Sequence, residues 1–154
     1  MTTTTIETNN LTGVALDWAV ALCEGYDFQL DDEVSGPWLI PQPGYLHDEK
    51  PLKSYSPSSD PAQGWPIIER QGIALRQNSN GKWYAMARAD AGDGQGMQWP
   101  EFTAQGGERY GVLSYQVRKR RQRFDGETSL IAGLRCHVAS EIGGRITVPN
   151  ELLA

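Results

Sequence analysis

The residues best suited to bind a ligand are a serine-rich turn, several aromatic rings and a set of arginines. The turn Tyr55-Ser56-Pro57-Ser58-Ser59-Asp60 offers hydroxyl groups and backbone amides on a loop. Aromatic rings provide stacking surfaces, and the forked guanidinium of arginine matches phosphate oxygens. These groups predict a site for a small anionic, nucleotide-like ligand. We expect the ligand to contact Tyr55, Ser56, Ser58, Arg70, Arg88, Trp99, Tyr115, Arg118 and Arg120.

The same groups also permit a structural interpretation. Tryptophan and tyrosine bury much apolar area, so a domain of this size needs many of its aromatic residues in the core. The hydroxyl groups and amides of the serine-rich turn can equally form hydrogen bonds that only hold the loop in place. Five bases fall within the six positions 118–123, which is typical either of an anionic partner or of a solvated strand end.

The chain has few of the residues that catalysis or metal binding commonly uses. The chain has two histidines, His47 and His137. His137 follows Cys136 within a helical pattern, and adjacent helical side chains point about 100° apart, which disfavours a nucleophile-base pair. The acidic runs 31–33 and 48–49 could ligate a cation or act as acids, or could be solvated loops. We expect no catalytic residue, no metal and no cofactor, and a binding protein is favoured over an enzyme.

Length and composition predict one small domain. The chain has 154 residues, of which 39% are hydrophobic and 21% charged, so we expect a single domain over residues 1–154. No run is long and apolar enough to span a membrane, and residues 1–5 lack the features of a signal peptide. We therefore expect a cytosolic protein without membrane contact, in which Cys23 and Cys136 are buried thiols.

Charge is unevenly distributed along the chain. Residues 1–50 hold nine acidic residues and a single base, Lys50, although the net charge is only −5. An acidic chain without a helix-turn-helix or zinc-finger pattern disfavours binding to duplex DNA. The acidic stretch 27–49 favours an alternative partner, a basic surface of another protein.

The chain is organised as two helices and several strands. Apolar patterns with a possible threonine cap and terminal glycines predict helices over 11–25 and 128–142. Strand patterns are seen at 67–76, 82–88, 110–120 and 145–148, with Asn80-Gly81 marking a hairpin turn between the first two.

The fold class that follows is α+β, with two helices packed on a small, mainly antiparallel sheet. Residues 26–66 carry seven prolines and few apolar runs, which is typical of a long loop. Their many aromatic residues argue against disorder. We expect a long ordered loop packed on the body, and a site built on such a loop leaves a homodimer open.

Three stretches of the chain form a recognisable series. They are Leu11-Thr12-Gly13 with Ala15-Leu16-Asp17-Trp18-Ala19-Val20-Ala21 and Cys23-Glu24, then Tyr55-Ser56-Pro57-Ser58 with Pro66-Ile67-Ile68-Glu69-Arg70, and finally Leu130-Ile131-Ala132 with Arg135-Cys136, Val138-Ala139-Ser140 and Val148-Pro149. In this order they resemble small bacteriophage accessory proteins, the NinX-like family of lambdoid phages. Residues 86–124 look longer than in the family and are the expected variable segment. The resemblance implies expression in the host bacterial cytoplasm, and it carries over no catalytic residue.

Three functional hypotheses remain. The leading one is a counter-defence protein that sequesters a nucleotide-derived host immune signal without cleaving it. The alternative is an inhibitor or adaptor that presents an acidic face to a host protein. The third is a metal-dependent nucleotide-processing enzyme using His47, Asp48 and Glu49, which would require these residues to converge in one cleft.

Overall fold

Three α-helices run through the part of the chain that the structure describes. The computed structural model describes residues 2–30, 36–87 and 123–153. Its helices are α1 (Gly13–Cys23), α2 (Pro61–Gln71) and α4 (Ser129–Glu141), with 3-10 turns η1 (Thr8–Asn10), η2 (Leu52–Ser54) and η4 (Asn150–Leu152). The α-helices have 11 to 13 residues. No helix among the described residues has the length and apolar character needed to cross a membrane.

The strands of these residues form three small antiparallel sheets. The strands are β1 (Thr3–Glu7), β2 (Tyr26–Leu30), β3 (Pro37–Pro41), β4 (Lys50–Pro51), β5 (Ala74–Gln77), β6 (Trp83–Met86), β7 (Arg123–Gly126) and β8 (Arg145–Pro149). β1 pairs with β8, and the other two sheets have the orders β2-β3-β4 and β5-β6-β7. The predicted α+β class is confirmed. The structure differs in detail, because it has three small sheets instead of one and adds helix α2.

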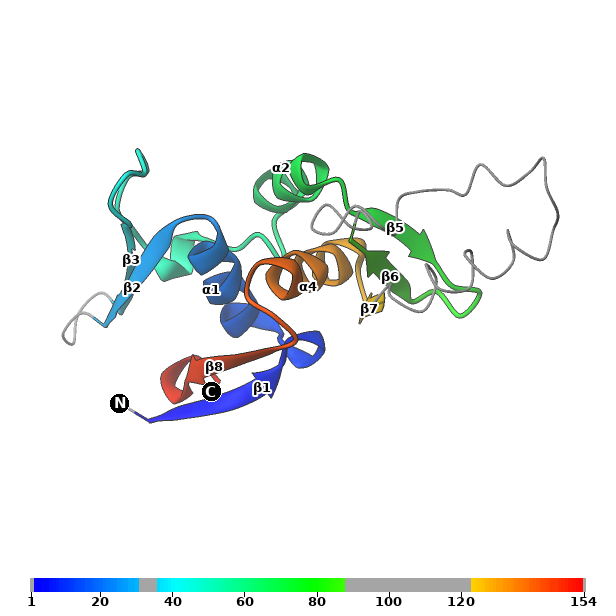
Figure 1. Ribbon diagram of the computed structural model, residues 1–154, viewed down its shortest axis with the longest axis horizontal. Coiled ribbons are helices and arrows are strands. Elements are labelled where there is room, and N and C mark those ends of the chain that lie inside the picture. Colours follow the sequence, from blue (N-terminus) through cyan, green and yellow to red (C-terminus); the bar gives the residue numbers. More distant parts are fainter. Residues whose placement is uncertain (1, 31–35, 88–122, 154) are drawn as a thin grey trace, which may run out of the picture.

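Helix α4 occupies the centre of the molecule (Figure 1). α1 and α2 both pack against it, and its opposite side faces the β5-β6-β7 sheet. Leu16 and Val20 of α1 and Leu134 and Val138 of α4 are fully buried, and they belong to one apolar core. Both chain ends lie in the β1-β8 ribbon below α1 and α4.

Residues 26–66 are not one long loop, and this expectation is corrected. They contain β2, β3, β4 and the first turns of α2. Four of the seven prolines stand at element ends: Pro37 and Pro41 bound β3, Pro51 ends β4, and Pro61 is the first residue of α2, whereas Pro66 lies inside α2. Proline is tolerated at such ends because the missing N–H is not needed there. The expectation that aromatic residues of this region pack on the body holds for Tyr26 and Tyr55, which are 4% and 9% exposed.

The strand expected at 67–76 is wrong over its first half, because residues 67–71 belong to helix α2 and β5 begins only at Ala74. The local signals for the remaining described elements are confirmed. The predicted helix 11–25 is α1, although its cap residue Thr12 makes no side-chain cap hydrogen bond. Thr128 does cap α4, because its hydroxyl accepts from the Ile131 N–H at 3.2 Å. Residues 78–81 turn the chain between β5 and β6, and the terminal strand is β8. The predicted strand 110–120 and nearly all of the variable segment 86–124 lie outside the described residues.

Candidate functional site

The serine-rich turn is anchored to α1 by a buried carboxylate. Asp17 is 7% exposed, and its Oδ1 accepts the backbone N–H of Ser58 at 2.8 Å. The Ser56 N–H donates to Gln63 Oε1 at 3.0 Å, and Asp60 caps α2 by accepting from the Ala62 N–H. Burial raises the pKa of Asp17, although the hydrogen bonds from Ser58 act in the opposite direction. These contacts support the structural interpretation of the turn, in which its serines pin it in place.

The turn also lines a hollow of about 470 Å³, which we call the serine hollow. Its lining residues are Gly13, Val14, Asp17, Pro37, Leu52, Lys53, Tyr55, Ser56, Ser58, Ser59, Glu151 and Leu152. Three of the nine predicted ligand residues, Tyr55, Ser56 and Ser58, are thus brought together there. Lys53 and Glu151 are exposed, whereas Leu52 and Leu152 supply a buried apolar floor.

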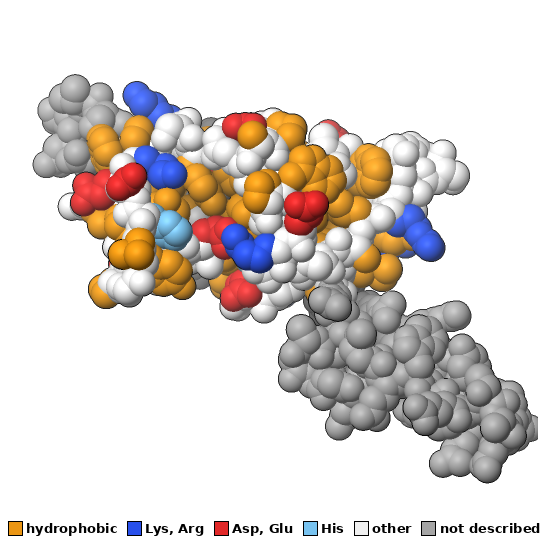
Figure 2. Space-filling model, turned by 90° about the horizontal axis from the view of Figure 1, so that it is seen from above, with side chains coloured by type: hydrophobic (Ala, Val, Ile, Leu, Met, Phe, Trp, Pro, Cys, Tyr) orange, Lys and Arg blue, Asp and Glu red, His pale blue; other side chains and the backbone are white. Residues whose placement is uncertain are grey.

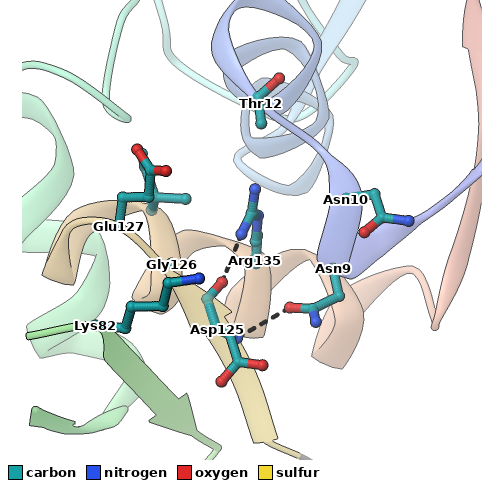
Figure 3. Close-up of a pocket in the computed structure, with 9 residues that line it drawn as sticks. Asn9, Asn10, Thr12, Lys82, Asp125, Gly126, Glu127 and Arg135 are labelled. Atoms are coloured by element: carbon teal, nitrogen blue, oxygen red, sulfur yellow. Dashed lines mark hydrogen bonds between the residues drawn. The ribbon is translucent and has the colours of Figure 1, made fainter. Parts of the chain in front are cut away.

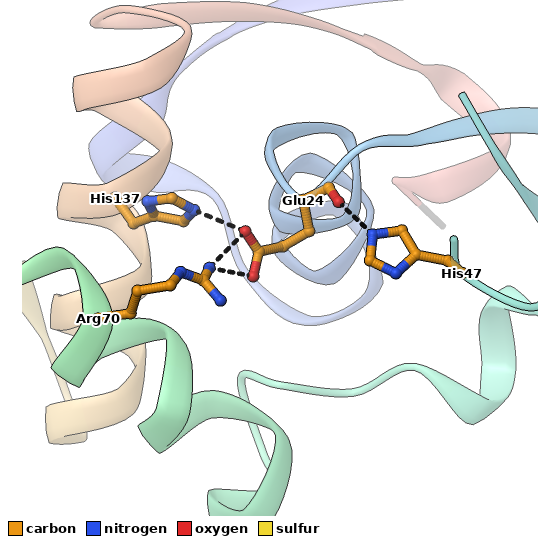
Figure 4. Close-up of polar contacts among 4 residues, drawn as sticks. All are labelled: Glu24, His47, Arg70 and His137. Atoms are coloured by element: carbon orange, nitrogen blue, oxygen red, sulfur yellow. Dashed lines mark hydrogen bonds and ion pairs between the residues drawn. The ribbon is translucent and has the colours of Figure 1, made fainter. Parts of the chain in front are cut away.

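Arg70, also a predicted ligand residue, lies elsewhere. It extends from the last turn of α2 to Glu24 at the end of α1, and its Nη2 donates to both carboxylate oxygens, at 2.7 Å for Oε2 (Figure 4). The Nε2 atom of His137 lies 3.7 Å from Glu24 Oε2, and neither ring nitrogen of this buried histidine has a hydrogen-bond partner. Burial would raise the pKa of Glu24, but His137 and Arg70 outweigh it, and the pKa of this carboxyl lies below its ordinary value. Arg70 therefore already has an anionic partner within the chain.

The remaining predicted ligand residues cannot be placed relative to these groups. Arg88, Trp99, Tyr115, Arg118 and Arg120 lie outside the described residues, and their roles stay predictions. On the face shown in Figure 2, acidic and basic side chains are interspersed among hydrophobic ones.

A second, more polar hollow was not predicted. Its volume is about 450 Å³, and we call it the polar hollow. It is lined by Asn9, Asn10, Thr12, Lys82, Asp125, Gly126, Glu127, Ile131 and Arg135 (Figure 3). The lining comes from η1, the start of α1, the β5-β6 turn, the end of β7 and the first turns of α4.

Arg135 is held in the polar hollow by backbone carbonyls. Its Nε donates to the Leu11 carbonyl at 2.8 Å, and its Nη1 donates to the Asp125 carbonyl at 2.6 Å. The Asp125 N–H in turn donates to Asn9 Oδ1 at 3.0 Å. Gly126 permits the close approach of β7 to α4, because a Cβ there would lie 2.5 Å from the Ala132 nitrogen. The guanidinium is therefore fixed in position before any ligand arrives.

The polar hollow is lined by two bases, Lys82 and Arg135, and by two acidic residues, Asp125 and Glu127. In the described part of the chain, neither Arg135 nor Lys82 has a carboxylate within ion-pair distance. Burial lowers the pKa of Arg135, and the carboxylates of Asp125 and Glu127 counteract this effect only at longer range. An arginine stays charged in spite of such a shift. The Asp125 carboxylate points away from Arg135 in Figure 3 and lies 3.7 Å from Arg123.

The polar hollow includes residues beside the N-terminal ends of two helices. Thr12 is the N-cap of α1, and Gly126 and Glu127 precede the N-cap of α4. The first turn of a helix has free N–H groups and a positive partial charge, so both helix ends favour an anion. The sequence analysis located both helix starts from their threonine cap signals at 12 and 128, but it did not relate them to a site. Nothing in the sequence shows that Lys82 and Arg135 meet there.

His47 and the two cysteines lie outside the polar hollow and have structural surroundings. The His47 Nε2 lies 2.8 Å from the Glu24 carbonyl oxygen, and its ring stacks on Tyr26 and Tyr45. Burial raises the pKa of both Cys23 and Cys136 to about 12, which disfavours a reactive thiolate. Among the residues that can be described, no three His, Cys, Asp or Glu side chains are grouped to hold a metal.

Comparison with known proteins identifies a phage family. The family model described as Bacteriophage P22, NinX matches residues 7–105, which is more than half of the chain. No curated protein matches the chain. The match contains the serine-rich turn and the residues that the polar hollow takes from η1, α1 and the β5-β6 turn, whereas Asp125 and Arg135 lie beyond it. The chain therefore belongs to the NinX family of bacteriophage proteins.

Proposed function

We propose that this phage accessory protein binds a nucleotide-like anion of the infected cell in the polar hollow and retains it without cleavage. The observation that carries the proposal is the pairing of Lys82 and Arg135 at one hollow without carboxylate partners among the described residues. A partly buried cation without a counter-ion is costly. A phosphate would supply the missing charge and would accept hydrogen bonds from the side chains of Lys82 and Arg135.

The rest of the lining favours a nucleotide over a simple inorganic anion. Asn9, Asn10 and Thr12 offer amide and hydroxyl groups that can bond to a base or sugar. The carboxylates of Asp125 and Glu127 repel a bare polyphosphate, but they accept hydrogen bonds from sugar hydroxyls and base amino groups. The volume of about 450 Å³ lies in the usual range of small-molecule sites, roughly 300–1,000 Å³.

Retention without cleavage is supported by where the reactive groups are. Both histidines and both cysteines of the chain lie outside the polar hollow. The hollow therefore lacks the most common general base and the most nucleophilic side chain. A phage protein that holds a nucleotide signal intact lowers its free concentration, which is the basis of the counter-defence role proposed here.

The test is thermal melting of the purified protein with a panel of linear and cyclic nucleotides, followed by recovery of each ligand after denaturation. At a ligand concentration of about 100 times Kd, binding stabilises by about 2.7 kcal/mol, a rise in Tm of roughly 5–10 °C for this chain length. We expect such a rise with the ligand recovered intact. An altered ligand would establish an enzyme, and the absence of any rise across the panel would reject the proposal and favour a host-protein partner.

Two substitutions test whether the ligand lies in the polar hollow. Lys82→Met removes one charge from the polar hollow, and we expect it to weaken binding about tenfold, since a charge-assisted contact contributes about 1.5 kcal/mol. Arg76→Met is the matched control, because Arg76 is an exposed base on β5 that lines neither hollow. Equal binding by the Lys82 and Arg76 variants would place the ligand elsewhere.

A further inference from the structure

The outer edge of β1 has no strand beside it. β1 pairs with β8 and with no other strand of the described residues. The Thr8 N–H donates to the Gly144 carbonyl at 2.9 Å, and the Asn150 N–H donates to the Thr2 carbonyl at 3.0 Å. Backbone groups alternate between the two sides of an antiparallel strand, so the even-numbered residues of β1 bond to β8. The residues whose N–H groups point away from β8 are Thr3, Thr5 and Glu7.

No other described segment covers this edge. Among the described residues, no further backbone hydrogen bond reaches Thr3, Thr5 or the N–H of Glu7. These three residues are exposed, and in Figure 1 β1 is the strand of the ribbon that lies farther from α1 and α4. Glu7 is the N-cap of η1, so this turn uses its carbonyl. The edge therefore offers the N–H groups of Thr3, Thr5 and Glu7 and the carbonyls of Thr3 and Thr5.

The edge of β1 also lacks the features that protect strand edges from pairing. Proteins commonly block such edges with proline or with charged side chains. The other edge strands of the described sheets each carry a proline or a charged residue between their ends: Asp27 in β2, Pro51 in β4, Arg76 in β5, Asp125 in β7 and Pro149 in β8. β1 has no proline, its one charged residue is the last, and its threonines favour extended backbone. It is therefore the edge most open to a further strand.

The sequence of β1 is complementary to a second copy of itself. In an antiparallel pair centred on Thr5, each Thr5 lies opposite the partner's Thr5, and each Glu7 lies opposite the partner's Thr3. The two Thr5 residues then exchange both N–H···O bonds, and the Glu7 N–H of each copy donates to the partner's Thr3 carbonyl. The two Glu7 residues are four positions apart along the strands, about 13 Å, which exceeds the screening length of about 8 Å at physiological salt. Each Glu7 is also neutralised within its own chain by Arg145, whose Nε lies 2.7 Å from Glu7 Oε1.

We propose that two copies of this chain associate by pairing their β1 strands antiparallel about a two-fold axis at Thr5. The two-stranded ribbon of each copy then becomes half of a four-stranded sheet with the order β8-β1-β1-β8. A ribbon of two strands is only marginally stable by itself, and a sheet of three or more strands is more stable. The association gains hydrogen bonds for the free groups of the edge, and it does not depend on the ligand proposed above.

The first test is sedimentation velocity of the full chain at concentrations from about 10 μM to 1 mM. One strand pair buries less surface than the roughly 1,200 Å² of stable complexes, so we expect a dissociation constant of about 0.1 mM. The weight-average mass should rise across this range from near that of one chain towards that of two. A mass that stays at one chain would overturn the proposal, and the edge of β1 would then be left to an extended segment of another protein.

A pair of substitutions tests whether β1 forms the interface. Thr5→Lys places two like charges opposite each other at the axis and should weaken dimerisation at least tenfold. Thr147→Lys is the matched control, because Thr147 lies beside Thr5 on the same exposed face of the ribbon. In the proposed dimer the two copies of Thr147 are three strand spacings apart, about 14 Å, so their charges are screened and dimerisation should persist. Equal dimerisation by the two variants would place the interface elsewhere and would overturn the proposal.

A charge exchange tests the register. Thr5→Lys and Thr5→Glu should each remain single chains at about 0.1 mM, whereas an equimolar mixture should dimerise, because a lysine of one copy faces a glutamate of the other. Failure of the mixture to dimerise, where the unmodified protein does, would overturn the register centred on Thr5. Thr5 and Thr147 are exposed, so we expect all variants to fold, and circular dichroism of each confirms that a lost dimer does not come from a lost fold.

Discussion

Two arginines of this protein, Arg70 and Arg135, are held in opposite ways. Arg70 extends from α2 to the carboxylate of Glu24 and is 54% exposed, so its charge is neutralised at the surface. Arg135 extends from α4 to two backbone carbonyls and has no carboxylate partner among the described residues. The sequence analysis placed Arg70 among the ligand residues, and it did not name Arg135. The difference teaches that an arginine is available to a ligand only if no distant segment has already supplied its anion.

The largest expected effect comes from Arg135→Met. This change leaves the carbonyls of Leu11 and Asp125 without their charged donor, and such hydrogen bonds contribute about 1.5–3 kcal/mol each. We expect a loss of about 3 kcal/mol in the free energy of unfolding, measured by urea denaturation. A loss below about 1 kcal/mol would mean that Arg135 does not join η1 to β7, and the contrast with Arg70 would disappear.

The next effect is that of Glu24→Gln, which removes the anion shared by Arg70 and His137. We expect a loss of about 1 kcal/mol at pH 7, since one partner is largely exposed. The pKa of Glu24 is lowered by folding, so its stabilising contribution is present above the unfolded value of 4.5 and is lost as the pH falls through the folded value. Urea denaturation of both proteins across this range should show their stabilities converging at low pH. A difference independent of pH would exclude ionisation of Glu24 as its cause.

A smaller effect is expected for Arg70→Met. Exposed ion pairs contribute little, so the free energy of unfolding should fall by only about 0.5 kcal/mol. Nucleotide affinity, measured by titration, should remain that of the unmodified protein. Weaker binding at unchanged stability would restore Arg70 to the ligand site and would contradict the contrast drawn here.

The smallest effect on stability is expected for Lys82→Met. Lys82 is exposed and has no carboxylate partner among the described residues, so its unfolding free energy should change by less than about 0.5 kcal/mol. Its nucleotide affinity should nevertheless fall about tenfold. Arg70→Met and Lys82→Met each remove one positive charge, but only Lys82→Met is expected to weaken nucleotide binding.

The parts of the fold that were predicted are those specified by neighbouring residues. The apolar pattern and flanking glycine gave α1, the Asn80-Gly81 pair gave the β5-β6 hairpin, and Thr128 gave the start of α4. The pairing of β1 with β8 was not predicted, because Thr3–Glu7 lacks a strand alternation and its partner lies near the other end of the chain. The strands within residues 26–66 were not predicted, because the seven prolines of this region were interpreted as signs of a continuous loop. Three of these prolines, Pro37, Pro41 and Pro51, lie instead at the ends of strands.

The candidate site also has one part that neighbouring residues in the sequence predict and one part that they do not. Tyr55, Ser56 and Ser58 are consecutive or nearly so, and the sequence alone predicted that they act together. The polar hollow joins Asn9, Lys82 and Arg135 from three separate segments, and their proximity depends on hydrogen bonds between residues more than 100 positions apart. No local pattern records such contacts, so the structure was needed to find them.

The bonds from Arg135 to Leu11 and from Asp125 to Asn9 also bear on how the protein is made. Ribosomes synthesise chains from the N-terminus at about 5–20 residues per second. The segment containing Asn9 and Leu11 therefore waits on the order of 10 s for its partners to be translated. β1 waits longer still, because its partner β8 follows Arg135 in the chain. A nascent chain that does not yet contain Arg135 cannot complete the polar hollow, so the activity proposed here begins only after this residue has been translated.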